Sequence, residues 1–299
     1  MRIAVAGASG MIGAALTADL DAAGHEVVRL VRREPRGPGE VRWDPADGSL
    51  DPDALGAVDA LVNVAGSTID RRWTRRAKEE IVESRVPTTR LLAQTAASLE
   101  PRPALVVSSA IGVYGIGGSR GEEELTEESS PGTGFLAELV QAWEAAADPA
   151  RAAGARVVHL RTSPVLSRGG GLLKRMSLPF KLGLGGRIAD GRQWWSWIEL
   201  DDVVAGYRHA LTSDLDGVVN LTSPNPVRNE EFVRSLGRAL HRPTVLPTPT
   251  LGIRLLFGDE ATKEAVLYGL RVLPARLQAE GFEFHHPELD HALAAALAD

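Results

Sequence analysis

The residues best suited to chemistry in this 299-residue chain form a glycine-rich turn near its start. Gly7, Gly10 and Gly13 follow a short apolar run over residues 2–6 and open a segment with apolar residues at helical spacing. Between a strand and a helix, such glycines let the main chain turn sharply and approach a diphosphate, which the free N–H groups of the helix then bind. The alternative is a tight turn without a ligand. The predicted dinucleotide contacts are Gly7, Ser9, Gly10, Met11, Ile12 and Gly13.

Two arginines at the end of the predicted second strand bear on which dinucleotide is bound. A site for NAD places a carboxylate there to accept a hydrogen bond from the ribose 2′-hydroxyl. Arg32 and Arg33 stand there instead, and guanidinium groups pair with a 2′-phosphate through charge and planar donor geometry. Ser9 adds a possible hydroxyl donor. Although a solvated arginine pair on a loop is the alternative, the sequence favours NADP(H) over NAD(H).

Alternating strand and helix patterns position these residues. Strands are predicted over residues 2–6, 25–31, 59–64, 104–108 and 156–161, and helices over residues 10–23, 78–99 and 135–153. This alternation implies a Rossmann-type, doubly wound parallel sheet with right-handed crossovers, an α/β fold. Beyond residue 165, glycine-rich and proline-rich connections replace the regular pattern. We expect a dinucleotide-binding domain over residues 1–165, to which some later elements return, and a smaller C-terminal substrate lobe over residues 166–299.

Composition excludes several classes of function. Lysine and arginine number 33 against 39 acidic residues, a formal net charge of −6, whereas a nucleic-acid surface needs a positive face. The absence of cysteine excludes disulfides, thiolate metal sites and a cysteine nucleophile. No apolar stretch approaches the roughly 20 residues of a membrane span, and no spacing of histidines and carboxylates matches a known metal site. We expect a cytoplasmic protein without nucleic-acid, membrane or metal binding.

Longer motifs resemble those of the extended short-chain dehydrogenase/reductase family. Asn-Val-Ala-Gly over residues 63–66 follows one predicted strand, and Ser-Ser-Ala-Ile-Gly-Val-Tyr-Gly begins at residue 108 within the next. The chain is most similar to the branch of atypical epimerase family proteins that carry a C-terminal domain of unknown function. Its markers are Trp43-Asp44-Pro45, Arg72-Trp73-Thr74, Ser84-Arg85 with Thr89, Trp143-Glu144-Ala145-Ala146, and motifs within residues 191–198 and 272–282.

This resemblance implies an NADP(H)-binding Rossmann domain, a smaller substrate lobe, and the branch's C-terminal domain at about residues 245–299. It also implies cofactor contacts from Ala65, Gly66, Ser108 and Pro164. The resemblance implies no known reaction; if the protein is an enzyme, we expect NADPH-linked oxidoreduction or epimerisation of a small carbonyl or hydroxyl compound. A homodimer is compatible with the sequence. One departure is visible, because relatives often have histidine where this chain has Glu199.

The usual catalytic groups of the resembled family are missing. Its redox-active members use a serine, a tyrosine and a lysine, with the tyrosine and lysine four residues apart on one helix face. Alignment on the Val-Tyr-Gly motif at residues 113–115 places Ala110, Phe135 and Leu139 at these positions. None of the three tyrosines, Tyr114, Tyr207 and Tyr268, has a lysine four residues later. A phenyl ring cannot donate a proton, so the usual proton transfer should fail.

Two interpretations remain open. Either the protein is an enzyme that recruited other acids and bases, or it binds the dinucleotide as a sensor or structural ligand and catalyses nothing. Ser109 and Tyr114 are the substitute catalytic candidates, although Tyr114 could instead pack under the cofactor. Glu199, with two following aspartates, could supply a base or simply cap a helix. His159 lies in an apolar strand and is predicted to belong to the core.

The substrate cleft is predicted from two tryptophans in the lobe and two polar residues of the predicted dinucleotide-binding domain. Trp195 and Trp197 should share one face of an extended segment and wall a pocket, unless they pack the core between the lobes. Thr68 and Arg72 should border the same cleft, where Arg72 could meet a charged substrate group.

Overall fold

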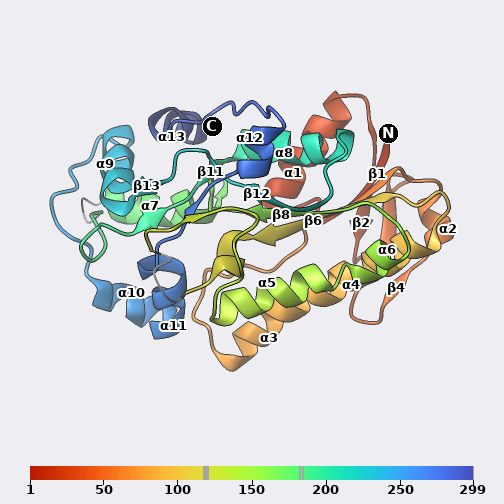
Figure 1. The fold of residues 1–299 in the computed structure, drawn as a ribbon, viewed down its shortest axis with the longest axis horizontal. Helices are drawn as coiled ribbons and strands as arrows, with labels where there is room; N and C mark the ends of the chain where they lie inside the picture. The colour runs from red at the N-terminus through yellow and green to blue at the C-terminus, as the bar shows by residue number, and fades with distance from the viewer. Residues whose placement is uncertain (117–120, 182, 184, 299) are drawn as a thin grey trace.

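The computed structural model describes residues 1–116, 121–181, 183 and 185–298, and its main sheet has eight strands (Figure 1). The strand order is β12-β8-β6-β5-β1-β2-β3-β4, and neighbouring strands run parallel except for β3 and β4. The chain adds β2 and β3 on one side of β1, and β5, β6, β8 and β12 on the other. Such a reversal leaves a crevice at the carboxyl ends of the strands where ligands bind. The predicted Rossmann-type fold with a smaller C-terminal lobe is confirmed.

The strands of the main sheet are β1 (Arg2–Ala6), β2 (Glu26–Val31), β3 (Glu40–Asp44), β4 (Ser49–Leu50), β5 (Ala60–Asn63), β6 (Ala104–Ala110), β8 (Val157–Thr162) and β12 (Gly217–Leu221). Short strands pair outside it: β7 (Glu124–Leu125) with β14 (Arg271–Val272), β9 (Val165–Ser167) with β11 (Ile198–Glu199), and β10 (Trp194–Trp195) with β13 (Val227–Arg228). The helices are α1 (Met11–Ala22), α2 (Pro52–Leu55), α3 (Arg75–Glu83), α4 (Val86–Ser98), η1 (Ile111–Tyr114), α5 (Phe135–Ala145), α6 (Asp148–Ala152), α7 (Gly171–Lys181), α8 (Leu200–Thr212), α9 (Asn229–Ala239), α10 (Thr250–Phe257), α11 (Asp259–Thr262), the π-helical turn η2 (Lys263–Leu267), α12 (Ala275–Ala279) and α13 (Leu289–Ala298).

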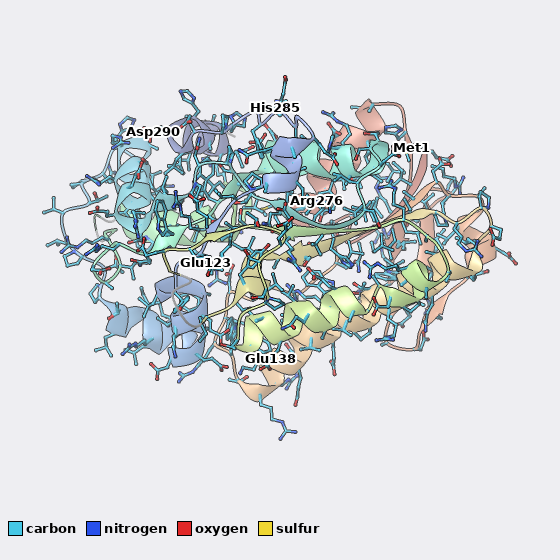
Figure 2. All side chains as sticks on the ribbon, viewed as in Figure 1. Met1, Glu123, Glu138, Arg276, His285 and Asp290 are labelled. Atoms are coloured by element: carbon cyan, nitrogen blue, oxygen red, sulfur yellow. The ribbon has the colours of Figure 1, made fainter. Side chains whose placement is uncertain are left out.

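Alternation along each strand divides the core into two layers. In β1, Ile3 and Val5 face the layer covered by α1 and α8, whereas Ala4 and Ala6 face the layer covered by α4, α5 and α6. Figure 1 shows these helix groups on opposite faces of the sheet. Side chains fill the space on both sides, and Arg276 fastens α12 to the edge strand by donating to the carbonyls of Asp216 and Val218 (Figure 2).

Two helices predicted as continuous are each broken in two. The predicted helix over residues 78–99 consists of α3 and α4, which meet at Ser84 and Arg85, and the one over residues 135–153 consists of α5 and α6. Both second helices have a proline in their first turn, Pro87 and Pro149. Proline lacks an N–H and clashes with the preceding turn, so it begins a helix more readily than it continues one.

The C-terminal lobe has its own core and also returns to the sheet domain. Leu173 of α7, Phe232 of α9 and Leu293 of α13 belong to one buried cluster. The segment of α10 and α11 crosses back toward α3, where Glu260 forms a 2.6 Å ion pair with Lys78. Among the described residues, no helix combines the length and apolar character needed to cross a bilayer.

His159 of β8 lies in the core, as predicted, with 1% of its surface exposed. Its Nε2 atom lies 3.3 Å from Nη2 of Arg151, whereas Nδ1 meets no partner among the described residues. Burial, opposed by the charge of Glu144, lowers the pKa of His159 to about 4. The folded state therefore holds this imidazole neutral at pH values where the unfolded chain protonates it.

This difference predicts an acid-linked loss of stability. A histidine with a depressed pKa in the folded state contributes full stability above its unfolded pKa of about 6.5, and loses it as the pH falls toward 4. The unfolding free energy of the parent should fall between pH 7 and pH 4.5. In His159→Gln this fall should be smaller by about 2 to 3 kcal/mol, as measured by urea denaturation. The exposed His291→Gln variant serves as the control, and an identical pH dependence in all three proteins would contradict the prediction.

Candidate cofactor and substrate site

The glycine turn joins β1 to α1 through close main-chain contacts. Gly7 has a φ of 83°, and a Cβ atom there would lie 2.7 Å from the nitrogen of Ala65. A Cβ atom on Gly13 would lie 2.1 Å from the carbonyl oxygen of Gly7. Gly10 differs, because it is exposed and has an extended backbone, and a Cβ atom there would lie 3.3 Å from the carbonyl oxygen of Gly7. Two glycines thus shape the turn, and the third keeps its surface open.

The first turn of α1 presents unoccupied amide groups. Among the described residues, no side chain caps this helix, and its first turn contains no acidic residue. The N–H groups at the start of α1 therefore face outward beside the open surface of Gly10, with the positive end of the helix dipole behind them. This is the arrangement that a diphosphate requires.

The other predicted cofactor residues follow neighbouring strands along the same edge of the sheet. Ala65 and Gly66 follow β5, Ser108 lies near the end of β6, and Pro164 follows β8. Gly66 and Pro164 are exposed, and Ser108 is half-buried. A further contact was not predicted: Gly170, in the loop before α7, approaches Met11 so closely that a Cβ atom would lie 2.9 Å from its sulfur. The lobe therefore borders the start of α1.

The two arginines after β2 have different surroundings. Arg33 donates from both terminal nitrogens to Glu40, at 2.7 and 2.5 Å, and these bonds lower the pKa of the Glu40 carboxyl to about 2. Arg32 is exposed and, within the described part of the chain, pairs with no carboxylate. Of the two, Arg32 is the guanidinium available to an incoming anion.

The helix face that should carry the acid of a typical dehydrogenase is apolar. The ring of Phe135 meets Trp73 edge to face at 5.1 Å, and Nζ of Lys78 lies 4.8 Å from its centre. Leu139, one turn later, is buried in the same cluster as Ile81. Neither position offers a group that can exchange a proton.

Ser109 and Tyr114, the predicted catalytic substitutes, point into the interior instead. Both are buried, and they join a network built on an ion pair between Glu144 of α5 and Arg161 of β8. Arg161 donates to both carboxylate oxygens of Glu144 at 2.8 Å, and the Ser109 hydroxyl donates to Glu144 at 2.6 Å. The hydroxyl of Tyr114 receives a 3.3 Å bond from Arg161 and lies 2.7 Å from Oδ1 of Asn220.

The charges of this network are mutually stabilised. Burial opposes ionisation of Glu144, but the bonds and charge of Arg161 outweigh it and hold the pKa of Glu144 below its usual value. Burial likewise opposes the charge of Arg161, and Glu144 reverses that effect and raises the pKa of Arg161. Burial raises the pKa of Tyr114, against the opposing charge of Arg161. Tyr114 therefore holds its proton within a paired structural network.

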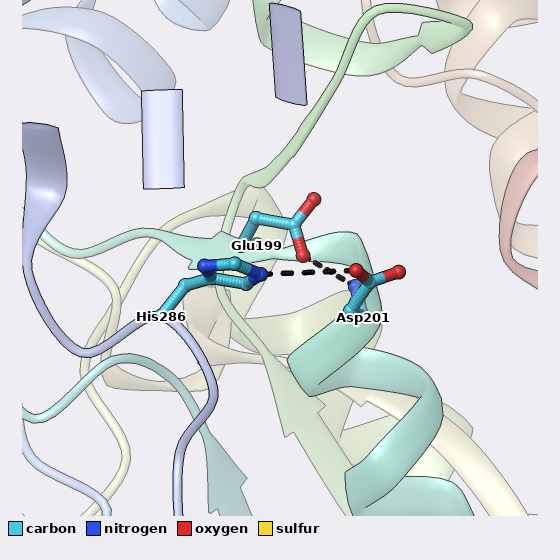
Figure 3. Close-up of side chains that lie close together, drawn as sticks. All are labelled: Glu199, Asp201 and His286. Atoms are coloured by element: carbon cyan, nitrogen blue, oxygen red, sulfur yellow. Dashed lines mark hydrogen bonds and ion pairs between the residues drawn. The ribbon is translucent and has the colours of Figure 1, made fainter. Parts of the chain in front are cut away.

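Glu199 serves as a helix cap. Its carboxylate accepts from the main-chain N–H of Asp201 at the start of α8, and burial raises the pKa of Glu199. His286 approaches from the C-terminal lobe, with Nε2 3.7 Å from Asp201 (Figure 3). One ligand atom from each of Glu199, Asp201 and His286 lies within 4.8 Å of the others. The sequence did not predict this grouping, because His286 lies 85 residues after Asp201. The cap and the ion pair account for the grouping without a metal.

The predicted cleft residues have different surroundings. Thr68 and Arg72 are exposed after β5, and Arg72 packs against Gly258 of the C-terminal lobe. Trp195 packs on Phe232 at 5.1 Å, and Trp197 is 1% exposed with its Nε1 donating to a main-chain carbonyl. The indole ring of Trp197 packs in the core of the lobe, so Trp197 does not line a cleft.

Two contributors near this edge were not predicted from the sequence. Glu264 reaches from the C-terminal lobe and accepts from the amides of Phe135 and Leu136, each at 3.1 Å, and so caps α5. Arg85, at the start of α4, lies under Gly66. The sequence held one signal for Arg85, because it belongs to a marker of the resembled branch. It held none for Glu264, which lies more than 120 residues from its partners.

The network predicts that Tyr114 contributes to stability rather than to proton transfer. Tyr114→Phe leaves Asn220 without its hydroxyl partner and should lower the unfolding free energy by about 1 to 3 kcal/mol, with unchanged affinity for a nicotinamide dinucleotide. Urea denaturation and calorimetry measure the two effects. Tyr207→Phe is the matched control, because its hydroxyl is also buried and its polar neighbour, Ser108, is too poorly placed for a well-formed hydrogen bond. Unchanged stability of Tyr114→Phe with abolished turnover would restore the catalytic interpretation.

Comparison with known proteins assigns the family. The pattern of the NAD dependent epimerase/dehydratase family matches residues 3–221, and that of a domain of unknown function (DUF1731) matches residues 248–296. An epimerase family protein of Mycobacterium bovis is 45% identical over 98% of this chain and 97% of its own. The crystal structure of human epimerase family protein SDR39U1 with NADPH has a TM-score of 0.88 and 36% identity, covering all of both chains.

A nucleoside-diphosphate sugar epimerase from Corynebacterium glutamicum gives a TM-score of 0.81 at 36% identity, and it covers 99% of this chain but 58% of that longer one. The resemblance inferred from the motifs is thereby confirmed. The chain belongs to the NAD dependent epimerase/dehydratase family, in the branch of epimerase family proteins that end in this domain of unknown function.

Proposed function

We propose that this chain binds NADP(H) at the glycine turn and uses it in oxidoreduction or epimerisation of a small carbonyl or hydroxyl compound. The observation that carries the proposal is the uncapped start of α1 beside the open surface of Gly10. The NADPH bound by the human relative, at 36% identity over the whole chain, supports the same choice of cofactor.

The residues present fit this cofactor. The amides at the start of α1 would hold the diphosphate, and Arg32 would hold the 2′-phosphate. Gly66 follows β5 and Ser108 lies near the end of β6, the next strands along the crevice from β1, so both would border the nicotinamide half. When bound, NADP(H) supplies hydride transfer, and the protein's part is to hold the ring and to exclude water.

A second function is favoured by one observation. The apolar contacts of Phe135 and Leu139, and the interior position of Tyr114, leave the helix face without the usual proton donor. A dinucleotide-binding regulatory or scaffold protein would need no such donor. Rapid mixing of the NADPH-loaded protein with a panel of small carbonyl compounds separates the two functions. Decay of the reduced-nicotinamide absorbance supports the enzyme, and stable absorbance together with tight NADPH binding supports the regulatory protein.

The surroundings of the two arginines predict unequal roles in cofactor choice. Arg32→Ala should weaken NADPH binding by at least about tenfold and leave NADH binding unchanged, because a charge-assisted contact to the 2′-phosphate is lost. Arg33→Ala is the matched control and should weaken NADPH binding by less than about threefold, since Arg33 already pairs with Glu40. Isothermal titration calorimetry measures both ligands. Equal affinities for NADPH and NADH in the parent would end the NADP(H) assignment.

A further inference from the structure

Arg85 places a positive charge without a carboxylate partner beside the predicted nicotinamide half of the crevice. Its guanidinium donates to the main-chain carbonyls of Ile81 and Ser67 and to the hydroxyl of Ser84, all neutral groups. Within the described part of the chain, no carboxylate lies within ion-pairing distance of it. Burial, reinforced by the like charge of Arg71, lowers the pKa of Arg85 to about 10, so the group stays charged at neutral pH.

The guanidinium lies between an aromatic ring and the loop that follows β5. On one side, its Cζ lies 5.2 Å from the centre of the Trp143 ring. On the other, a Cβ atom on Gly66 would lie 3.2 Å from Cζ, which is closer than most such contacts, so the guanidinium packs tightly against this glycine. Gly66 is exposed, and it immediately follows Ala65, which touches the glycine turn through Gly7. A ligand that rests on Gly66 is therefore separated from the charge by little more than one layer of main chain.

An unpaired charge in such a place acts on any charge that a ligand brings. The nicotinamide ring carries a positive charge in NADP⁺ and none in NADPH. A fixed cation nearby disfavours only the oxidised ring, and low-dielectric surroundings strengthen the effect. Building on the proposed binding of NADP(H), we propose that Arg85 makes this site prefer the reduced nicotinamide over the oxidised one. The protein would then rest with NADPH bound, which suits a reduction.

A purely structural role makes a different prediction. The bond to Ile81 satisfies a carbonyl near the end of α3, where the helix dipole favours a cation. If Arg85 only stapled the loop after β5, its loss would weaken NADPH and NADP⁺ binding equally. The ratio of the two affinities therefore separates the roles, whereas either affinity alone does not.

The test compares the parent with Arg85→Gln and Arg85→Lys in calorimetric titrations with NADPH and NADP⁺ at one ionic strength. Arg85→Gln should lower the preference for NADPH several-fold, because it removes the fixed positive charge that disfavours the oxidised ring. Arg85→Lys keeps the charge and should retain the preference. Equal weakening of both forms, or an unchanged ratio, in Arg85→Gln would overturn the inference.

A second variant covers the case in which Arg85→Gln does not fold. Ser84→Asp places a carboxylate beside the guanidinium, since the Ser84 hydroxyl lies 3.1 Å from Nη1 of Arg85. The new carboxylate can still accept a hydrogen bond from the amide of Ser67. Ser84→Asp should lower the preference for NADPH over NADP⁺ as Arg85→Gln does, whereas Ser84→Asn should leave it unchanged. An unchanged ratio in Ser84→Asp would also count against the inference.

Adenosine 2′,5′-bisphosphate, which lacks nicotinamide, should bind the parent and Arg85→Gln equally. If the parent binds neither it nor NADPH, the proposed function fails instead.

Discussion

The contact between Gly7 and Gly13 is the constraint on which the site depends. The carbonyl of Gly7 occupies the space that any side chain at residue 13 would need, so α1 leaves β1 at one close distance. Because of this close packing, the uncapped first turn of α1 lies at the carboxyl ends of the strands, where the strand order reverses. Neighbouring strands then deliver Arg32, Gly66 and Pro164 to the same edge. The proposed cofactor site is thus a consequence of main-chain packing more than of side-chain chemistry.

The interior network explains why Ser109 and Tyr114 do not replace the groups that a typical dehydrogenase uses. Glu144 and Arg161 neutralise each other under the sheet edge, and they take up the hydroxyls of Ser109 and Tyr114. Removal of one partner would leave a buried charge unpaired, which is strongly destabilising. The C-terminal lobe completes the arrangement, because Glu264 satisfies the first amides of α5. Ser109 and Tyr114 therefore stabilise the fold through this network and are not free to take part in proton transfer.

The sequence predicted what depends on local order. The glycine turn and five of the parallel strands (β1, β2, β5, β6 and β8) follow from spacing and alternation within short segments, whereas the prolines that divide the two long predicted helices were not used in the prediction. Contacts between distant segments were beyond it. Nothing near Tyr114 indicates that Arg161 and Asn220 engage its hydroxyl, and nothing near Trp197 shows that the lobe closes over it. Likewise, the two adjacent arginines look equivalent until the fold brings Glu40 against one of them.

The most direct test of the account is NADPH binding by Gly10→Val. Gly10 is exposed and has an extended backbone, and a Cβ atom there would lie 3.3 Å from the carbonyl oxygen of Gly7, so the variant should fold after a small main-chain shift, with a thermal midpoint slightly below that of the parent. The added side chain would cover the amides at the start of α1, and calorimetry should detect no NADPH binding. A folded Gly10→Val protein that binds NADPH as tightly as the parent would contradict the claim that these bare amides hold the diphosphate.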